Sequence, residues 1–515
     1  EENPPKVVSV IGDASLGAGV AFEAINHAGA SGTPMLVILN DNEWSISKSV
    51  GALAKYLSKV RANRLVQRAG QETKSLIQAI PLIGARVDRA LDDLGEVMRH
   101  AVVPGHIFEE AGVRYVGPVD GHDVNGMVDV LRKVSELDGV VILHVLTEKG
   151  KGHPDGPNHP ERVHAVKPKA NAADYKTEGT PVERKAQGVA YTKAFADSLE
   201  QSAAGDVRVH AITAGMPSGT GLVGFAERYP GRFHDTGITE QHAVAMAAGM
   251  AKGGLRPVVA IYSTFIQRGY DQCFQELALQ DLPVVLALDR AGPVGQDGPT
   301  HHGAYDLAFL RTLPNFVLGA PRDATDMRRM LSCLLNQNHP SAMRYPRGNT
   351  PHEECLPEAE RRPMQPGKAE VLREGADVVL WAYGSMVATA LEVAAIWRQA
   401  GVEVGVVDAR FTKPLDEDLL AQHLREYSHI VSLEAHQRMG GFGSAILESA
   451  SRTPIPEGTH PARVKVLGLP DRFLEHKTSA DEQLMEAGLD VPRIVRTVGN
   501  LLPAGKRQLL QQLER

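Results

Sequence analysis

The chain has 515 residues, of which 43% are hydrophobic and 23% charged, so it can form large buried cores and is not a disordered chain. Its 55 Lys and Arg against 62 Asp and Glu give a net charge of −7, which argues against a nucleic-acid-binding protein because such proteins are normally basic. The three cysteines form no CxxC pair and support neither a disulfide framework nor a zinc site. No apolar stretch approaches the roughly 20 residues of a membrane span, so we expect no membrane partner and a reducing compartment.

Short apolar stretches of strand length alternate with helical patterns along the whole chain. The first strands are expected at 7–11 and 35–39, around a helix at 18–28. The same alternation continues, with strands expected at 207–213, 257–262, 283–288, 378–382, 402–407 and 430–433, and helices at 241–252, 264–280, 385–399 and 416–425. This pattern predicts an α/β fold whose mostly parallel sheets are flanked by helices.

Two segments rich in proline, glycine and charge, 150–182 and 348–368, interrupt this alternation and read as linkers. They divide the chain into three expected domains, 1–165, 183–350 and 365–515. The first apolar run starts at residue 7, so close to a glycine-containing turn that we expect an upstream part to be missing from the sequence.

Two polar motifs directly follow the first two expected strands. They are Gly12-Asp13-Ala14-Ser15 and the segment that contains Asn42. Open α/β sheets bind ligands at the carboxyl ends of their strands, and carboxylate and carboxamide oxygens suit Mg²⁺ bound to phosphates. A helix that begins near Gly17 would point its N-terminus at those phosphates. Alternatively, Asp13 merely caps that helix. The string GAGVAF (17–22) lacks the last glycine of GxGxxG, which disfavours a dinucleotide-binding fold.

These motifs, GDASLGAGVAFEAINHAG (12–29) and MLVILNDNEWSIS (35–47), resemble those of the 1-deoxy-D-xylulose-5-phosphate synthase family, transketolase-like enzymes that use thiamine diphosphate. The resemblance continues over nearly the whole chain in the family's order, with GPVDGHD (117–123), TEKGKG (147–152), TEQHAV (239–244), AIYSTFIQRGYDQ (260–272), DRAGPVGQDGPTHHGAYD (289–306), RYPRGN (344–349), RFTKPLD (410–416) and GLPDRF (468–473). The long strings are specific, whereas a Gly-Asp turn alone is not. The resemblance implies a transketolase-like fold of three domains.

The resemblance implies cofactor-binding roles for residues of the first block. Asp13 and Asn42 would hold Mg²⁺, and the main-chain carbonyl of Trp44 would complete the protein ligands. Ala14 and Ser15 continue the cofactor motif next to Asp13. Lys149, in a Gly-Lys loop, would meet the diphosphate; the alternative is a solvated loop charge.

Further residues match positions around the reacting end of the cofactor. Glu240 matches the family's catalytic glutamate, which pairs with a ring nitrogen of the cofactor's pyrimidine; the alternative is a first-turn glutamate that the helix dipole favours. Phe265 matches the aromatic residue that packs on the aminopyrimidine ring, and core packing is its alternative. His164 and His301 are expected to act in catalysis, although a lone histidine is more often structural.

Arginines from three motifs suit a phosphorylated substrate, since guanidinium groups match phosphate geometry. These are Arg268, Arg290 and Arg347. By resemblance, Arg290 and Arg347 bind the phosphate of glyceraldehyde 3-phosphate, whereas any single arginine is more often part of a surface ion pair. The polar residues expected to contact the same substrate are Tyr262, Asp297 and His301.

The resemblance implies a transferase that condenses pyruvate with glyceraldehyde 3-phosphate, releases CO2 and forms 1-deoxy-D-xylulose 5-phosphate for isoprenoid and thiamine synthesis. It also implies a homodimer in which the first two domains of one chain form each site. The alternatives are a non-catalytic relative that binds or regulates a partner, and another thiamine-diphosphate enzyme such as a transketolase. We expect a bacterial cytoplasmic location, with a plastid left open. Ala14 stands where the family has glycine and Trp44 where it has methionine; we expect Ala14 to be tolerated if its φ is negative.

Overall fold

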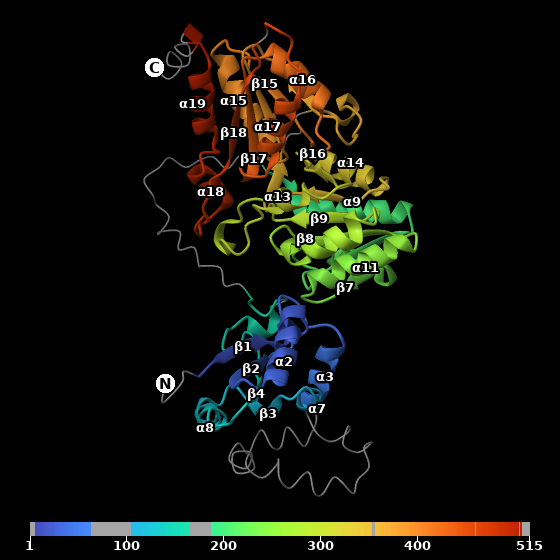
Figure 1. Ribbon diagram of the computed structural model, residues 1–515, viewed down its shortest axis with the longest axis vertical. Helices are drawn as coiled ribbons and strands as arrows, with labels where there is room; N and C mark the ends of the chain where they lie inside the picture. The colour runs from blue at the N-terminus through green and yellow to red at the C-terminus, as the bar shows by residue number, and fades with distance from the viewer. Residues whose placement is uncertain are drawn as a thin grey trace, which may run out of the picture. The chain divides into compact units, whose positions relative to one another are not determined.

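The computed structural model describes residues 6–62, 105–159, 161–164, 187–352, 356–458, 460–503 and 505–506. The chain forms two compact units, the first made of residues 1–179 with 235–239 and the second of residues 180–234 with 240–515 (Figure 1). Within the described ranges, no helix is both long and apolar enough to cross a membrane.

The first unit is built on a parallel four-stranded sheet with the order β1-β2-β4-β3 (Figure 1). Its strands are β1 (Val8–Gly12), β2 (Met35–Asp41), β3 (Arg114–Asp120) and β4 (Val140–Leu146). Its helical segments are α1 (Asp13–Leu16), α2 (Gly19–Ser31), α3 (Ala52–Ala62), α7 (His106–Glu110), α8 (Val124–Val134) and the 3₁₀ turn η1 (Gly156–Asn158).

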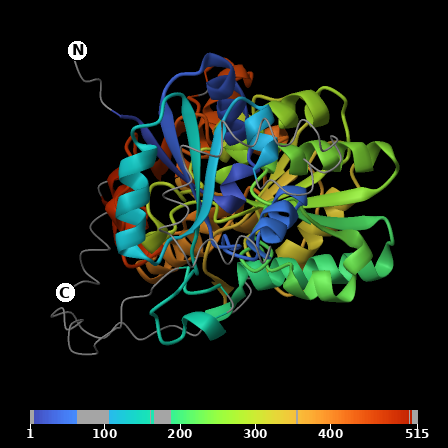
Figure 2. The same ribbon diagram turned by 90° about the horizontal axis from the view of Figure 1, so that it is seen from below.

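Alternating residues of these strands pack into two separate cores, because successive side chains of a strand point to opposite faces. Val37 and Leu39 of β2 pack in the core that includes Leu57 of α3. Their neighbour Leu36 packs in the core that includes Val130 of α8. Figure 2 shows α8 beside the strands that it covers. The apolar runs that predicted strands here are therefore runs buried on both faces, as in parallel sheets.

The second unit contains a seven-stranded sheet with the order β16-β10-β11-β9-β8-β6-β7. Its strands are β6 (Val209–Thr213), β7 (Phe233–Asp235), β8 (Arg256–Tyr262), β9 (Val285–Asp289), β10 (Val317–Gly319), β11 (Ser341–Arg344) and β16 (Phe411–Lys413). Its helical segments are α9 (Tyr191–Gly205), α10 (Val223–Arg228), η2 (Pro230–Arg232), α11 (Glu240–Lys252), η5 (Gly295–Asp297), α13 (Asp306–Leu310) and α14 (Ala324–Leu335). Side chains of α9 and α14 share one core with the sheet, and side chains of α11 share another.

A five-stranded sheet with the order β13-β15-β14-β17-β18 completes the second unit (Figure 1). Its strands are β13 (Glu370–Arg373), β14 (Val378–Ala382), β15 (Gly405–Asp408), β17 (His429–Gln437) and β18 (Arg463–Leu469). Its helices are α15 (Met386–Gln399), α16 (Glu417–Glu426), α17 (Phe442–Arg452), α18 (Ala480–Glu486) and α19 (Val491–Leu501). The antiparallel pair of β5 (Gln187–Ala190) and β12 (Asn349–Pro351) joins the segments just before α9 and just after β11, and the 3₁₀ turn η6 (Glu358–Glu360) precedes β13.

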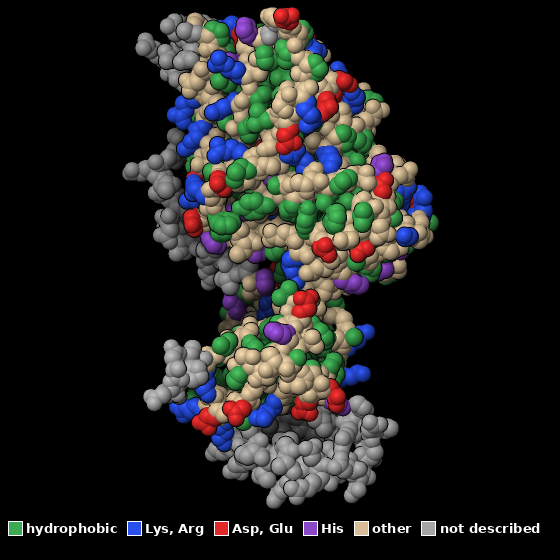
Figure 3. All heavy atoms as spheres, viewed as in Figure 1, with side chains coloured by type: hydrophobic (Ala, Val, Ile, Leu, Met, Phe, Trp, Pro, Cys, Tyr) green, Lys and Arg blue, Asp and Glu red, His purple; other side chains and the backbone are tan. Residues whose placement is uncertain are grey.

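The predicted α/β fold with mostly parallel sheets is confirmed; β13 and β16 are antiparallel additions to their sheets. Because β16 comes from the third predicted block yet pairs with β10, that block contributes to the seven-stranded sheet. The predicted boundaries of the three domains stay a prediction. On the face of the second unit seen in Figure 3, acidic and basic side chains are interspersed, in keeping with the modest net charge.

One predicted helix, at 264–280, takes a different form. It consists of a 3₁₀ segment η3 (Phe265–Gly269), a short α-helical turn α12 (Tyr270–Gln272) and a π-helical segment η4 (Cys273–Ala278). Gly269 approaches the backbone of Glu240 so closely that a Cβ atom there would lie 3.4 Å from its carbonyl oxygen. Such irregular helical turns often occur at functional sites, because they re-aim side chains.

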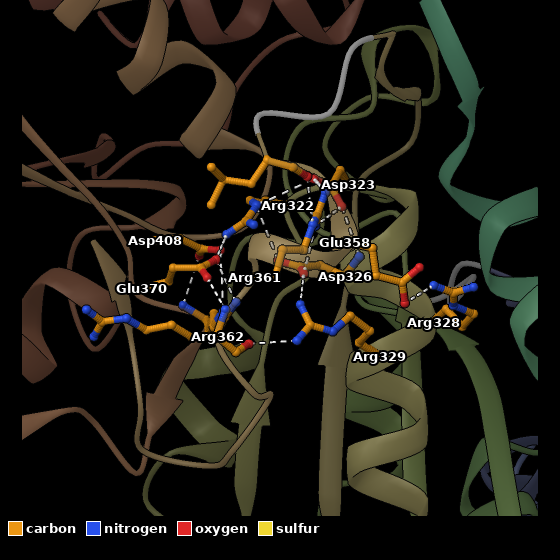
Figure 4. A network of polar contacts seen from close by, with 12 residues as sticks. Arg322, Asp323, Asp326, Arg328, Arg329, Glu358, Arg361, Arg362, Glu370 and Asp408 are labelled. Atoms are coloured by element: carbon orange, nitrogen blue, oxygen red, sulfur yellow. Dashed lines mark hydrogen bonds and ion pairs between the residues drawn. The ribbon is translucent and has the colours of Figure 1, made fainter. Parts of the chain in front are cut away.

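A buried network of charged side chains holds the segment that precedes β13 of the five-stranded sheet (Figure 4). Arg322, just before α14, lies 2.6 Å from Glu370 of β13 and 2.7 Å from Asp408 of β15. Arg361 lies 2.8 Å from Asp323 and 2.9 Å from Asp326. These groups are almost completely buried, so each charge depends on its partners for stabilisation.

Candidate functional site

The first unit brings Asp13 and Asn42 together at one edge of its sheet. The parallel register pairs Gly12 of β1 with Asn40 of β2, so both strands end at the same place. Asp13 is buried; its Oδ2 accepts a hydrogen bond from the Ser49 hydroxyl at 2.7 Å, and its Oδ1 accepts one from the Asn42 backbone N–H at 3.4 Å. Burial raises the pKa of Asp13, with the neighbouring Asp41 acting in the same direction.

The residues next to Asp13 and Asn42 adopt conformations that their side chains tolerate. Ala14 and Ser15 lie in α1, and the φ of Ala14 is negative, so the alanine in place of glycine causes no backbone strain. Trp44 donates its backbone N–H to the Asn42 side-chain oxygen at 2.9 Å. The indole of Trp44 stacks under the Arg162 guanidinium, whose carbon lies 5.2 Å from the ring centroid.

Lys149 and His164 lie close to each other, and Asp13 acts electrostatically on Lys149. The Lys149 ammonium lies 2.9 Å from Nδ1 of His164 and donates to the Ser45 carbonyl oxygen. Burial lowers the pKa of Lys149, whereas Glu161 and Asp13 counteract the shift. Since Asp13 acts electrostatically on Lys149, a cationic side chain and a hard carboxylate lie within reach of one another, as a site for a metal-bound phosphate requires.

A buried chain of polar groups supports the carboxyl end of β2. His144 of β4 lies 2.9 Å from Asp41 Oδ2 through its Nε2 and 2.6 Å from the Tyr115 hydroxyl through its Nδ1. Arg61 donates to the Asp41 carboxylate at 2.9 Å and to its backbone carbonyl. The pKa of Asp41 is lowered because the contacts with His144 and Arg61 together outweigh burial. Sequence reasoning missed these residues, although a histidine inside the apolar run VVILHV was a visible signal.

In the second unit, Glu240 opens α11. Buried apolar residues recur with helical spacing after it, at 243, 244, 247, 248 and 251, and they fix the face of the helix that packs in the core. Glu240 itself is only 3% exposed, and its carboxylate forms an ion pair with Arg268 of η3. Burial raises the pKa of Glu240, and Arg268 opposes that shift. The structure therefore gives Arg268 a carboxylate partner, in addition to any substrate role.

Aromatic rings gather around Phe265. Its ring stacks on that of Tyr262 with the centroids 5.7 Å apart, and the His301 ring meets it edge-on at 5.3 Å. The Arg290 guanidinium lies over the other ring of this pair, 4.4 Å from the centroid of Tyr262. Burial raises the pKa of Tyr262 to about 12, so the hydroxyl stays protonated at neutral pH.

Two arginines of this cluster are held by protein groups. Arg290 contacts Asp289 at 3.0 Å and donates to the Thr192 hydroxyl at 3.1 Å and to the Gly219 carbonyl at 2.8 Å. Arg347 contacts the Asp297 carboxylate at 2.5 Å. Asp297 and Arg347 also act electrostatically on Tyr262. The six second-unit residues expected around a substrate therefore form one neighbourhood with Glu240 and Phe265: Tyr262, Arg268, Arg290, Asp297, His301 and Arg347.

The arrangement offers two kinds of chemistry. The first unit holds hard oxygen ligands and a lysine, which suit a divalent ion and a phosphate. The second unit holds a buried carboxyl group beside aromatic surface and guanidinium groups, which suit a heteroaromatic ring and an anionic substrate. Within the described ranges, no group of three or more His, Cys, Asp and Glu side chains can hold a metal ion, so a metal at Asp13 would need the amide and carbonyl ligands predicted above.

Comparisons with known proteins match this organisation. The family model for 1-deoxy-D-xylulose-5-phosphate synthase matches residues 1–147, the transketolase pyrimidine-binding domain matches 187–353 and the transketolase C-terminal domain matches 367–494. The chain is similar to 1-deoxy-D-xylulose-5-phosphate synthase of Desulforudis audaxviator, at 45% identity over 493 residues, 95% of this chain and 75% of the relative. It is also similar to that of Heliobacterium modesticaldum, at 42% identity over 500 residues, 97% of this chain and 75% of the relative.

Solved structures give the same fold. A split-gene transketolase described as an inactive β4 tetramer is 30% identical, with a TM-score of 0.54 over 61% of this chain and 99% of that one. Transketolase from Campylobacter jejuni shares the fold at 17% identity, with a TM-score of 0.52 over 96% of this chain and 77% of that one. The chain therefore belongs to the 1-deoxy-D-xylulose-5-phosphate synthase family and is a transferase of the transketolase class.

Proposed function

We propose that the protein condenses pyruvate with glyceraldehyde 3-phosphate, releasing CO2 and forming 1-deoxy-D-xylulose 5-phosphate. The family relationship over 95% of the chain carries this proposal. The neighbourhood of Glu240, Phe265 and three arginines supports it, because it combines a buried carboxyl group with groups that bind an anion. The product serves isoprenoid and thiamine synthesis, and we propose a homodimer in the cytoplasm.

The proposed cofactor is thiamine diphosphate with Mg²⁺. Asp13, Asn42 and the Trp44 carbonyl would hold the ion, and Lys149, Ala14 and Ser15 would face the diphosphate. Two observations fit this role: buried Asp13 has neutral hydrogen-bond donors as its partners, and a Cβ atom added at Gly12 or Gly17 would meet nothing within 4 Å. When bound, the cofactor supplies a carbon nucleophile and an electron sink for decarboxylation.

The residues of the second unit would orient the cofactor and hold protons. Glu240, whose pKa burial raises, would share a proton with a pyrimidine ring nitrogen, and Phe265 would pack against the ring. The nearby Arg268 limits how far the pKa of Glu240 rises, which keeps the carboxyl group able to exchange that proton. His301 in the second unit and His164 in the first are proposed to donate or accept protons at the reacting groups.

The arginine groups would select the phosphorylated aldehyde. Arg347, at the surface of this neighbourhood, would bind the phosphate with Arg290, while Tyr262 and Asp297 would contact the polar part of the substrate. Arg290 is held by Asp289 and by the Gly219 carbonyl, so its guanidinium is fixed before substrate arrives. Such preorganisation lowers the entropic cost of binding an anion.

The test is product analysis with the full chain, thiamine diphosphate and Mg²⁺. With pyruvate and glyceraldehyde 3-phosphate we expect CO2 and 1-deoxy-D-xylulose 5-phosphate in equal amounts. A Glu240→Gln variant should lose at least 100-fold in turnover, as is typical for loss of general acid–base catalysis (about 10²–10⁴-fold). The exposed Glu426→Gln, in α16, is the matched control and should keep full activity. Product from a ketose phosphate donor without CO2 would identify a transketolase instead, and absence of any cofactor-dependent product would support a non-catalytic relative.

A further inference from the structure

The segment 290–306 carries three of the residues proposed to contact substrate, yet residues near the C-terminus hold it in place. Arg290, Asp297 and His301 lie in this segment. Gly295 at its centre begins the 3₁₀ turn η5, next to the N-terminus of α18. The contacts that fix this turn come from residues 474–483, more than 150 positions along the chain and still in the second unit.

Gln483 of α18 forms most of the hydrogen bonds that hold this turn. Its side chain is fully buried, and its Oε1 accepts a hydrogen bond from the Gly295 N–H at 2.7 Å. Its Nε2 donates to the Glu475 carbonyl at 2.7 Å and to the Gly295 carbonyl at 3.3 Å. One buried amide therefore satisfies both backbone groups of Gly295, and the polar atoms of Gln483 are all used.

His302, whose Nε2 lies 3.4 Å from Gln483 Nε2, adds a second link between this turn and the segment 474–483. Nδ1 of His302 accepts from the Val294 N–H at 3.3 Å, and Nε2 lies 3.2 Å from the Leu474 carbonyl oxygen. These contacts fit the neutral ring that donates from Nε2. Burial lowers the pKa of His302, which favours that neutral form. Residues on both sides of Gly295 are thus tied to the segment 474–483.

Close packing leaves the turn little freedom to move. Gly295 has φ +71°, a conformation that favours glycine. A Cβ atom added there would lie 3.0 Å from the backbone of Ser479. The turn is therefore fixed by hydrogen bonds and by backbone contact, and not only by side-chain packing.

Arg347 contacts the turn on both sides of Gly295. Arg347 donates to the Val294 carbonyl at 3.2 Å and contacts Asp297 at 2.5 Å. These two partners lie on either side of Gly295 in the sequence, and Gly295 is the residue that Gln483 holds. We propose that Gln483 is a positioning residue that fixes the turn at Gly295 and so sets the Asp297–Arg347 pair for recognition of the substrate phosphate. This inference rests on the proposed function, in which Arg347 binds that phosphate.

The experiment compares a phosphorylated with an unphosphorylated aldehyde. Gln483→Met removes the hydrogen bonds at nearly constant volume, and Gly295→Ala disturbs the same contact from the other side should the first variant fold poorly. With pyruvate as donor, both should lower kcat/KM for glyceraldehyde 3-phosphate at least tenfold through KM, since displacements of about 1 Å cost up to 10²-fold. D-Glyceraldehyde, which lacks the phosphate and keeps only the contact with Asp297, should lose clearly less in kcat/KM, and KM for pyruvate should not change.

Val498→Ala is the matched control for lost stability. Val498 is fully buried in α19, in the core of the five-stranded part of the second unit. Val498→Ala should change kcat/KM for the two aldehydes by the same factor. Hydrogen exchange adds a readout without turnover, since amides of 294–302 should exchange at least tenfold faster in Gln483→Met and Gly295→Ala but not in Val498→Ala.

Three outcomes decide between the claims. Equal losses of kcat/KM for the two aldehydes, or unchanged hydrogen exchange at 294–302, would overturn the positioning role of Gln483. The proposed function would still stand in that case if the wild-type chain forms the product. A wild-type chain that forms no product from pyruvate and glyceraldehyde 3-phosphate overturns the proposed function, and the positioning role falls with it.

Discussion

Replacing Arg361 with methionine should destabilise the second unit more than any surface change. Figure 4 shows the buried guanidinium groups of Arg322 and Arg361 with the buried carboxylates of Asp323, Asp326, Glu370 and Asp408. Buried Arg410 joins this network through its ion pair with Glu370. Arg361→Met would remove the contacts of 2.8 and 3.0 Å to the carboxylate of Asp323 and of 2.9 Å to that of Asp326. Arg322 lies 3.5 Å from Asp323 and 3.3 Å from Asp326, and Arg329 lies 3.5 Å from Asp326.

Because Asp323 and Asp326 would lose their shortest guanidinium contacts and keep their desolvation penalty, we expect a loss of about 3–5 kcal/mol in the free energy of unfolding. Urea denaturation followed by tryptophan fluorescence measures it, since Trp381 and Trp397 are fully buried in the five-stranded part of this unit. Adding Asp326→Asn to the variant should recover at least half of the loss, because it removes one of the two buried charges that lost their shortest contacts. A loss below about 1 kcal/mol, typical of exposed pairs, would refute the reasoning.

Two further predictions concern pH and metal binding. His436 is fully buried and neutral, accepting from the Leu307 N–H at 3.2 Å and contacting the Gln437 carbonyl at 2.7 Å, and burial lowers its pKa from 6.5 to about 4. The unfolded chain takes up this proton first as the pH falls, so the free energy of unfolding should drop by about 2 kcal/mol between pH 6.5 and 5, and His436→Asn should flatten that slope in urea titrations. Ser49→Ala, which removes the hydrogen bond of 2.7 Å to Asp13, should raise the Mg²⁺ concentration for half-maximal thiamine diphosphate binding about tenfold, measured by quenching of Trp44; an unchanged midpoint would argue against metal binding at Asp13.

Local sequence patterns were enough to predict the α/β fold and several of its strands and helices. Strands such as β2 and β14 are continuous apolar runs, and this pattern depends only on neighbouring residues. Asp13 and Asn42 directly follow such strands, so their meeting at one edge of the sheet followed from parallel pairing. The irregular form of 264–280 could not be read in this way, because the helical pattern of its side chains does not specify the hydrogen-bond pattern of its backbone.

Contacts between distant segments were decided by the tertiary structure alone. No sequence pattern predicts the ion pair of Arg268 with Glu240 or the hydrogen bond between Gly295 and Gln483. None predicts that His144 lies between Asp41 and Tyr115 either. The sequence by itself determined the family, the α/β layers and the strand ends that carry the polar motifs, since these depend on periodicity and on short spacings. Which side chains become hydrogen-bond or ion-pair partners depends instead on which ones the folded sheets bring close together and remove from water. Only the packing of the whole chain decides this.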